Sequence, residues 1–277
     1  MGSRDPRRFM GPEKTTPYTL LQCQKKSQFL DSDNLRRDGR TPADARKQFM
    51  SVGVITQAKG SAYVEIGDTK VVCGVYGPKE VQRGNDFKMT CQVLCEVKFA
   101  PFSCTIRKSP QPDRRQKEMS RQLKETLEAV IVLEKFPKSQ IDVFVTVIED
   151  EGGLLSACIT AAGLALCHAN IDVYDIVTGA SMLWHKGILY VDPSRHEEEC
   201  ERILGQSKES EGGGSLTVGV MPTHASGQVA LMLQEGEVSP EAVIEGLNLA
   251  VESSQKIYTL SRQTLLDHVE SALQDGK

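Results

Sequence analysis

The chain has 277 residues, of which 39% are hydrophobic and 25% charged, a composition typical of a globular domain with a sizeable core. No apolar run approaches the roughly 18 residues of a membrane-spanning helix. The arginine-rich N-terminal end lacks the apolar segment of a secretory signal peptide. None of the eight cysteines forms a Cys-x-x-Cys pair. We therefore expect reduced thiols, no metal site and no membrane contact, as in a cytosolic or nuclear protein.

The charge is unevenly distributed along the chain. The formal net charge is −4, yet residues 98–124 carry eight Lys/Arg against two Asp/Glu, whereas residues 186–277 carry seven against fifteen. An acidic protein can still present a basic face to a polyanion, because charges are screened beyond about 8 Å at physiological salt. The basic segment is therefore a candidate nucleic-acid contact.

The N-terminal half is predicted to be rich in strands. Residues 1–34 are polar and weakly periodic, which is typical of a tail. Three β-prone runs follow, and the Gly67-Asp68 pair between the second and third predicts a hairpin. The predicted strands are residues 52–57, 61–66, 70–75 and 89–99. The basic, proline-containing stretch 100–114 predicts an exposed loop.

The following segments alternate helices and strands. Apolar residues at three- and four-residue spacing predict a helix over residues 115–136, and a strand follows at 140–148. Residues 149–153 predict a turn into a second helix, 154–168, which is almost wholly apolar and should be buried.

The last hundred residues repeat that alternation. Paired strands are predicted at residues 175–183 and 187–191, and a short helix with a mobile charged loop over 196–214. Two more strands are predicted at 215–221 and 227–233. Ser239-Pro240 is a favourable start for a long final helix. The sum is an α+β (α/β-like) fold: one domain over residues 35–277, with mixed sheets and buried crossover helices.

Four motifs in fixed order resemble the RNase PH family of phosphorolytic ribonucleases. They are Arg-Asp-Gly-Arg-Thr-Pro at 37–42 followed by Arg46, Ala-Lys-Gly-Ser-Ala at 58–62, Glu-Gly-Gly at 151–153 before Ile-Thr-Ala-Ala at 159–162, and Asp-Ile-Val at 175–177 before Val191-Asp192. Within the family the chain is most similar to a eukaryotic RNA exosome ring subunit, through Arg7-Arg8, residues 11–13, 57–63 and 173–175.

The resemblance implies partners and a cellular setting. It implies a hetero-hexameric ring of RNase PH-like subunits, cap subunits with S1 and KH domains, and associated catalytic nucleases that receive single-stranded RNA. It also implies a location in the nucleus, nucleolus and cytoplasm.

The phosphate site that the resemblance implies is altered. Active relatives read Asp-Gly-Gly-Thr-Arg, whereas this chain has Glu151-Gly152-Gly153 followed by Leu154 and Leu155. Losing a charge-assisted contact of this kind costs about 1.5–3 kcal/mol. The three acids at residues 149–151 should also repel phosphate. We expect Gly152 and Gly153 to form a tight turn for folding, and a working anion site is the alternative.

An acidic pair is the second part of the implied active site. Asp192 matches the first position, and Glu198 stands where a second aspartate is usual. Such carboxylates can hold magnesium or assist proton transfer. The alternative is that Asp192 ends a strand and residues 197–199 form a solvated charge run. We expect a vestigial active site with no catalytic residues and no cofactor; metal-dependent hydrolysis and active phosphorolysis are the rivals.

The basic residues are expected to contact RNA. Arg114 and Arg115 match positions that contact the RNA backbone in active relatives. Clustered cations bind a polyanion without reading its bases, through counterion release. The predicted RNA-contacting residues are Arg107, Lys108, Arg114, Arg115, Lys117 and Arg121, with Lys124 on the same helix side.

Other interpretations of the basic residues, the aromatic residues and the histidines stay open. The basic face can simply be solubilising, in a structural protein without RNA contact. Because Phe99 and Phe102 are the only aromatic residues near the loop, base stacking is not indicated. His168 and His185 have no nucleophile partner visible in sequence, so we expect core or surface histidines.

Overall fold

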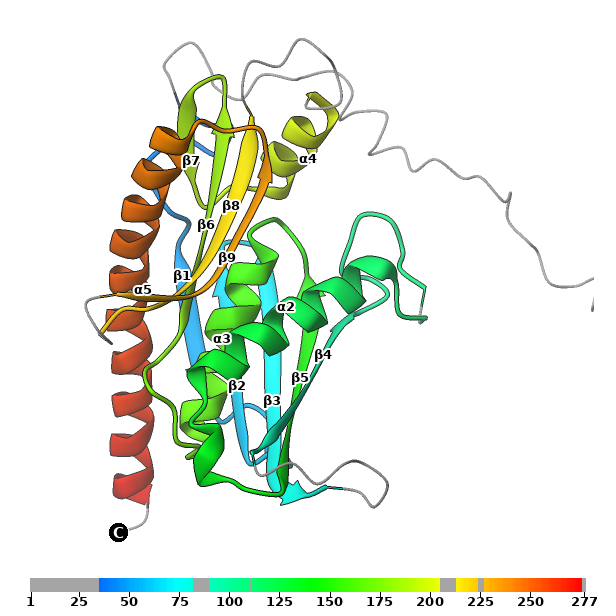
Figure 1. The fold of residues 1–277 in the computed structure, drawn as a ribbon, viewed down its shortest axis with the longest axis vertical. Helices are drawn as coiled ribbons and strands as arrows, with labels where there is room; N and C mark the ends of the chain where they lie inside the picture. The colour runs from blue at the N-terminus through cyan, green and yellow to red at the C-terminus, as the bar shows by residue number, and fades with distance from the viewer. Residues whose placement is uncertain (1–34, 82–89, 110, 205–212, 224–226, 276–277) are drawn as a thin grey trace, which may run out of the picture.

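The computed structural model describes residues 35–81, 90–109, 111–204, 213–223 and 227–275. The predicted tail at 1–34 and residues 205–212 of the predicted mobile loop lie outside the described residues. The described chain forms two sheets with helices packed between and around them (Figure 1). This is the α+β architecture that the sequence predicted.

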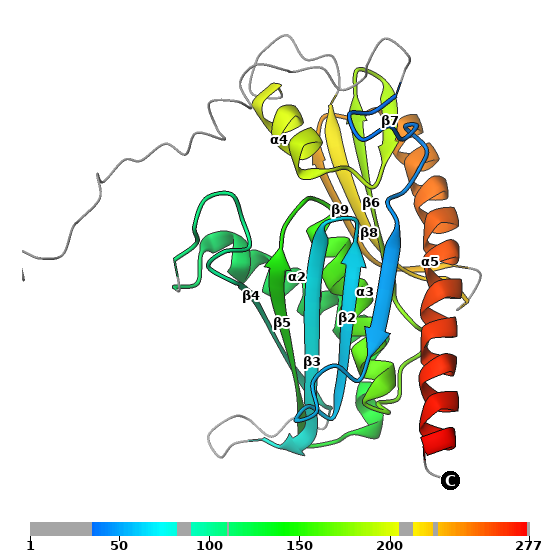
Figure 2. The same ribbon diagram turned by 180° about the vertical axis from the view of Figure 1, so that it is seen from behind.

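The first sheet has five strands in the order β1-β2-β3-β5-β4. Its strands are β1 (Gln48–Val52), β2 (Gly60–Ile66), β3 (Thr69–Glu80), β4 (Gln92–Phe99) and β5 (Ser139–Glu149). All neighbours are antiparallel except β4 and β5. A parallel pair needs a long crossover, which α2 (Arg114–Val130) and the 3-10 helix η1 (Leu133–Lys135) supply. Figure 2 shows this sheet from its uncovered side.

The second sheet has four antiparallel strands in the order β7-β6-β8-β9. Its strands are β6 (Thr178–His185), β7 (Ile188–Val191), β8 (Gly214–Met221) and β9 (Gln228–Gly236). Helix α4 (Arg195–Leu204) follows β7, and the long α5 (Pro240–Asp275) runs along one side of the molecule (Figure 1). Ser239 begins α5 as predicted, since its carbonyl accepts from Val243 N–H at 3.1 Å.

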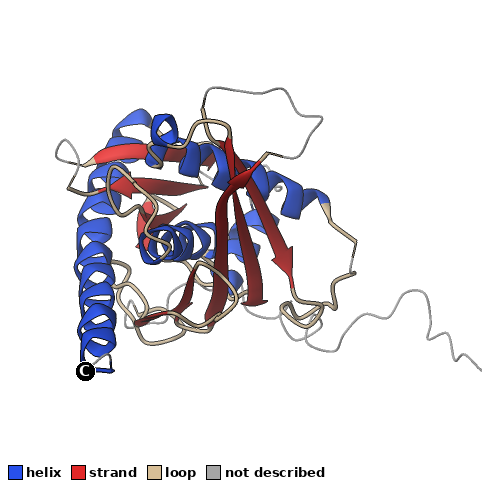
Figure 3. Cartoon of the chain, turned by 90° about the horizontal axis from the view of Figure 1, so that it is seen from below, coloured by secondary structure: helices blue, strands red, loops and turns tan. Residues whose placement is uncertain are grey.

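Helix α3 (Leu154–His168) lies between the two sheets, as the view from below shows (Figure 3). Twelve of its residues are buried, as its apolar sequence predicted. Small residues permit the close packing on both sides. A Cβ on Gly163, for example, would lie 2.6 Å from the Val177 carbonyl oxygen. The helix is therefore the centre of the core, and its N-terminus opens toward one end of both sheets.

Several predicted boundaries were wrong for identifiable reasons. The strand predicted at 52–57 is β1, which ends at Val52 because Gly53 turns the chain with φ +78°. The helix predicted to reach residue 136 ends at Val130, because Ile131 is extended and bridges Val173. The strand predicted from residue 175 begins at Thr178. The short helix predicted at the start of 196–214 is confirmed as α4, which begins one residue earlier, at Arg195.

Candidate active site at the α3 N-terminus

The turn from β5 into α3 requires glycine at two successive positions. Gly152 has φ +94° and Gly153 has φ +59°, values that side chains disfavour. A Cβ on Gly152 would also lie 2.4 Å from Arg195 N, and one on Gly153 would lie 2.8 Å from Arg46 Nη2. The two glycines thus have a sufficient structural reason, independent of any bound anion.

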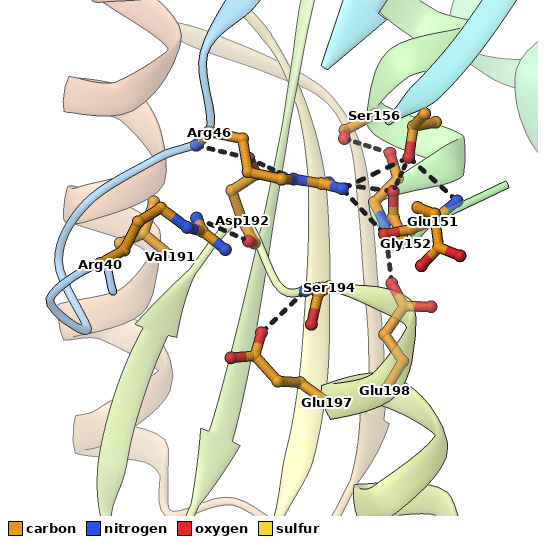
Figure 4. Close-up of polar contacts among 12 residues, drawn as sticks. Arg40, Arg46, Glu151, Gly152, Ser156, Val191, Asp192, Ser194, Glu197 and Glu198 are labelled. Atoms are coloured by element: carbon orange, nitrogen blue, oxygen red, sulfur yellow. Dashed lines mark hydrogen bonds and ion pairs between the residues drawn. The ribbon is translucent and has the colours of Figure 1, made fainter. Parts of the chain in front are cut away.

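Arg46 links this turn to the end of β7 through hydrogen bonds and an ion pair. Its guanidinium donates to both Asp192 carboxylate oxygens, at 2.6 and 2.9 Å, and to the carbonyls of Glu151 at 2.8 Å and Gly152 at 3.0 Å (Figure 4). Burial lowers the pKa of Arg46, but the hydrogen bond and charge of Asp192 outweigh it, so the pKa lies above its ordinary value. Asp192 therefore spends both oxygens on an internal ion pair.

A wider set of arginines fixes the same corner. Arg36 is 1% exposed and donates to the Val191 carbonyl at 2.7 Å. Arg40 donates to the Asp192 carbonyl at 3.4 Å (Figure 4). Asp192 itself has φ +52°, which aspartate tolerates better than most residues. The segment around the Arg-Asp-Gly-Arg motif is thus bound to the end of β7, far along the chain.

Glu198 occupies the N-terminal amide of α3. Its Oε1 accepts from Gly153 N–H at 2.8 Å (Figure 4). Burial raises the pKa of Glu198 above its ordinary value, and the Gly153 hydrogen bond partly offsets that rise. A helix N-terminus favours an anion through its free amides and its dipole. Here a carboxylate of the chain itself takes that place.

The residues after Gly153 provide no side-chain donor for an anion. Leu154 is 3% exposed and belongs to the main hydrophobic core, against which the half-buried Leu155 packs. Ser156 directs its hydroxyl back to the Gly153 carbonyl at 2.7 Å. The side chains in the first turn of α3 are therefore either apolar or already hydrogen-bonded within the turn.

The three acids of the turn are less repulsive than expected. Glu149 pairs with Lys70 at 2.8 Å. Asp150 is buried between two arginines, Arg115 at 3.4 Å and Arg195 at 3.7 Å. Two of the three acids thus have cationic partners, which reduces the repulsion expected from them. The acid that contacts the turn directly is Glu198, whose hydrogen bond to Gly153 N–H the sequence did not specify.

The run at 197–199 is not a solvated charge run, contrary to one reading of the sequence. Glu197 is 5% exposed, accepts from Ser194 N–H at 2.7 Å and lies 3.7 Å from Arg36. Glu199 pairs with Arg195 at 2.8 Å. Each glutamate thus has a different partner, and together they seat α4 on the site.

A cleft of about 640 Å³ opens beside the α3 N-terminus, between α2, α3 and strands β6, β8 and β9. That size suits a small ligand or one nucleotide-sized group. Its charged lining comprises five carboxylates and two guanidiniums, Arg114 and Arg115. The excess of carboxylates disfavours a small anion. The Ser181 hydroxyl also lines the cleft and has no hydrogen-bond partner among the described residues.

The predicted RNA-contacting residues divide into two groups. Arg115 pairs with Asp150 and lies over the Phe99 ring at 5.7 Å, and Lys108 lies 3.6 Å from Asp113. Arg121 and Lys124 pair along the helix with Glu125 and Glu128. In the described part of the chain, no ion pair engages the exposed Arg107, Arg114 and Lys117. The free basic surface is therefore smaller than the sequence indicated.

The two singled-out histidines contact other parts of the chain, and His185 is buried whereas His168 is partly exposed. His185 Nδ1 lies 2.6 Å from Glu201 Oε2, joining β6 to α4. His168 Nδ1 accepts from Ser61 N–H at 3.1 Å, and its Nε2 faces His268 Nε2 at 3.2 Å. Within the described ranges no three His, Cys, Asp or Glu side chains are grouped to hold a metal ion, and no helix is long and apolar enough to cross a membrane.

Comparison with known proteins gives independent evidence on the family to which this chain belongs. Residues 44–172 match the RNase PH description "3′ exoribonuclease family, domain 1". "Exosome complex component Rrp41" of Pyrobaculum arsenaticum is 35% identical over 255 residues, or 91% of this chain and 94% of the relative. The protein of the same name from Cenarchaeum symbiosum is 31% identical over 239 residues, or 86% and 93%.

Solved structures agree in fold. Rice (Oryza sativa) Rrp46 superposes with a TM-score of 0.68 at 25% identity, covering 83% of this chain and 100% of that one. An Archaeoglobus fulgidus exosome with RNA bound to the active site gives a TM-score of 0.67 at 24% identity, covering 81% and 92%. This chain therefore belongs to the RNase PH family of 3′ exoribonucleases.

Proposed function

We propose that the chain is a non-catalytic, RNA-contacting subunit of an RNA exosome core ring, of the type called mRNA transport regulator three. The observation that carries the loss of catalysis is the occupied α3 N-terminus. Glu198 accepts from Gly153 N–H at 2.8 Å, and Leu154 and Leu155 follow where a phosphate site needs donors. A phosphate would meet a carboxylate instead of a guanidinium.

The proposal includes partners. Relatives named exosome components are similar along nearly the whole chain, so we infer a ring of RNase PH-like subunits around single-stranded RNA. S1- and KH-domain caps and a separate nuclease would complete the assembly. Its work would be the processing and decay of rRNA and mRNA, in the nucleus, nucleolus and cytoplasm. Native mass spectrometry of the purified assembly tests the stoichiometry.

Catalysis is tested with the full chain, alone and with its ring partner, on end-labelled single-stranded RNA with and without inorganic phosphate. We expect no shortening and no nucleoside diphosphate. Phosphate-dependent shortening that is lost in Glu198→Gln, a variant that keeps the acceptor for Gly153, would instead establish the rival function of an active phosphorolytic exoribonuclease. The observation that favours this rival is that both carboxylates lie beside Gly153: Glu198 accepts from its N–H, and Asp192 Oδ1 would lie 3.1 Å from a Cβ at that position.

RNA contact is tested by the salt dependence of binding. Cations bound to phosphates release counterions, so removing one such cation lowers the slope of log affinity against log salt by about 0.7 for a single strand. Arg107→Gln and Arg114→Gln should each weaken binding and lower the slope. The paired residue Arg121 supplies the matched control, and Arg121→Gln should change little. Equal slopes in all variants would favour a structural protein without RNA contact.

A further inference from the structure

The loop between β4 and α2 presents an apolar tip inside the basic surface. Phe102 is 73% exposed and Ile106 is 52% exposed, whereas Ser103 between them is only 3% exposed. Exposing a phenylalanine ring to this degree costs hydrophobic free energy that folding would normally recover. The ring is therefore free to contact a partner outside the chain.

The loop is fixed at its base. Lys108 N–H donates to the Pro101 carbonyl at 3.0 Å, which closes the loop on itself. Ala100 N–H donates to Val147 at 2.9 Å, and the Ser103 carbonyl accepts from Asp150 N–H at 3.0 Å, which ties both ends of this turn to the end of β5. Figure 1 shows the segment extending beyond the N-terminal end of α2. Phe102 is therefore presented by an anchored loop.

The surroundings of the ring identify the chemistry of its partner. Arg107 and Arg114 are exposed in the same loop and at the start of α2, and no described residue forms an ion pair with either. The other phenylalanine here, Phe99, is 6% exposed and already faces Lys108 and Arg115. Phe102 thus shares its loop with the exposed Arg107, and Arg114 follows that loop directly. Exposed cations in the same segment as an exposed aromatic ring match a single-stranded nucleic acid, whose backbone is anionic and whose bases stack on aromatic faces.

We propose that Phe102 is a stacking platform for one base of a single-stranded RNA whose backbone lies along Arg107 and Arg114. This deepens the proposed RNA-contacting function and rests on it. It also reverses the expectation that base stacking is not indicated here. That expectation counted aromatic residues, but what matters is that one of the two is exposed.

The experiment compares full-length variants by fluorescence anisotropy with labelled oligo-A and with an abasic oligonucleotide that keeps the sugar-phosphate backbone. Phe102→Ala should weaken oligo-A binding roughly 5- to 150-fold, the range of one base–aromatic stack. It should leave the salt slope and abasic binding unchanged. Phe102→Tyr should restore the affinity. Phe49, 58% exposed on β1 at the opposite edge of the sheet, supplies the control Phe49→Ala, which should bind as wild type.

A second readout uses the single tryptophan of the chain, Trp184, which is 4% exposed. Phe102→Trp adds an exposed fluorophore, and oligo-A but not the abasic strand should quench it. Wild-type affinity in Phe102→Ala overturns the inference, as does an equal loss on both strands. If Phe102→Ala instead impairs only the assembly of the subunits, the Phe102 side chain contacts a neighbouring protein and the inference is wrong. Absence of any wild-type RNA binding sinks the proposed RNA contact itself, a different result.

Discussion

Arg46 offers the sharpest test of the idea that the contacts around the α3 N-terminus stabilise the fold. Arg46→Ala would leave Asp192 without its buried partner, since their side chains are 8% and 9% exposed. It would also remove the donors to the Glu151 and Gly152 carbonyls. Removing one partner of a buried ion pair costs about 3–5 kcal/mol.

That magnitude is measurable by two methods. At about 2–4 °C per kcal/mol for a domain of this size, the melting temperature should fall by about 6–20 °C. Urea unfolding followed by circular dichroism gives the free energy of unfolding directly. Arg46→Lys keeps the charge but loses the planar fork, so it should recover only part of the loss.

Two comparisons isolate the mechanism. Arg121→Ala removes an exposed arginine from a helical pair and should change stability by no more than about 0.5 kcal/mol. In an Asp192→Ala background, Arg46→Ala should cost clearly less than in the wild type, because no unpaired carboxylate remains. If Arg46→Ala alone lowers the free energy of unfolding by less than about 1 kcal/mol, the contacts of Arg46 do not stabilise the fold as proposed.

Three further predictions concern the same core. Glu198→Gln keeps an acceptor for Gly153 N–H and removes a carboxyl group whose pKa is raised in the folded protein. The free energy of unfolding of the wild type should therefore fall as pH rises from about 4.5 through that raised pKa. Urea unfolding at a series of pH values should show that the variant lacks this fall. The pKa of His168 is lowered by burial and, to a smaller extent, by His268. The free energy of unfolding should therefore fall as pH drops below about 6.5 and level off below the pKa of the folded protein. His168→Asn should flatten that part of the pH profile, and an unchanged profile would contradict the attribution of this pH dependence to His168. Leu155→Arg alone should not create phosphate binding in isothermal titration calorimetry, because Glu198 still holds the Gly153 amide, and submillimolar binding would contradict this.

Much of the fold was accessible from local patterns. The apolar helix at 154–168 was predicted with its boundaries because burial on every side leaves no polar stripe. The hairpin around Gly67-Asp68 followed from turn chemistry. Helix α2 was predicted too long because the end of a helix depends on whether the next residue finds another partner. Ile131 finds it in Val173, about forty residues away in sequence.

The sequence by itself determined that Leu154 and Leu155 follow Gly153 and offer a phosphate no side-chain donor, because residue identity fixes which donors exist. Only the tertiary structure decided which groups occupy the N-terminus of α3. Glu198 reaches Gly153 from 45 positions away, and Arg46 reaches Asp192 across 146. Such pairings depend on where the fold places α4 and the segment before β1 relative to the turn into α3, and no local periodicity encodes them. Exposure is likewise a tertiary property, which is why Phe99 and Phe102, three residues apart, have opposite environments.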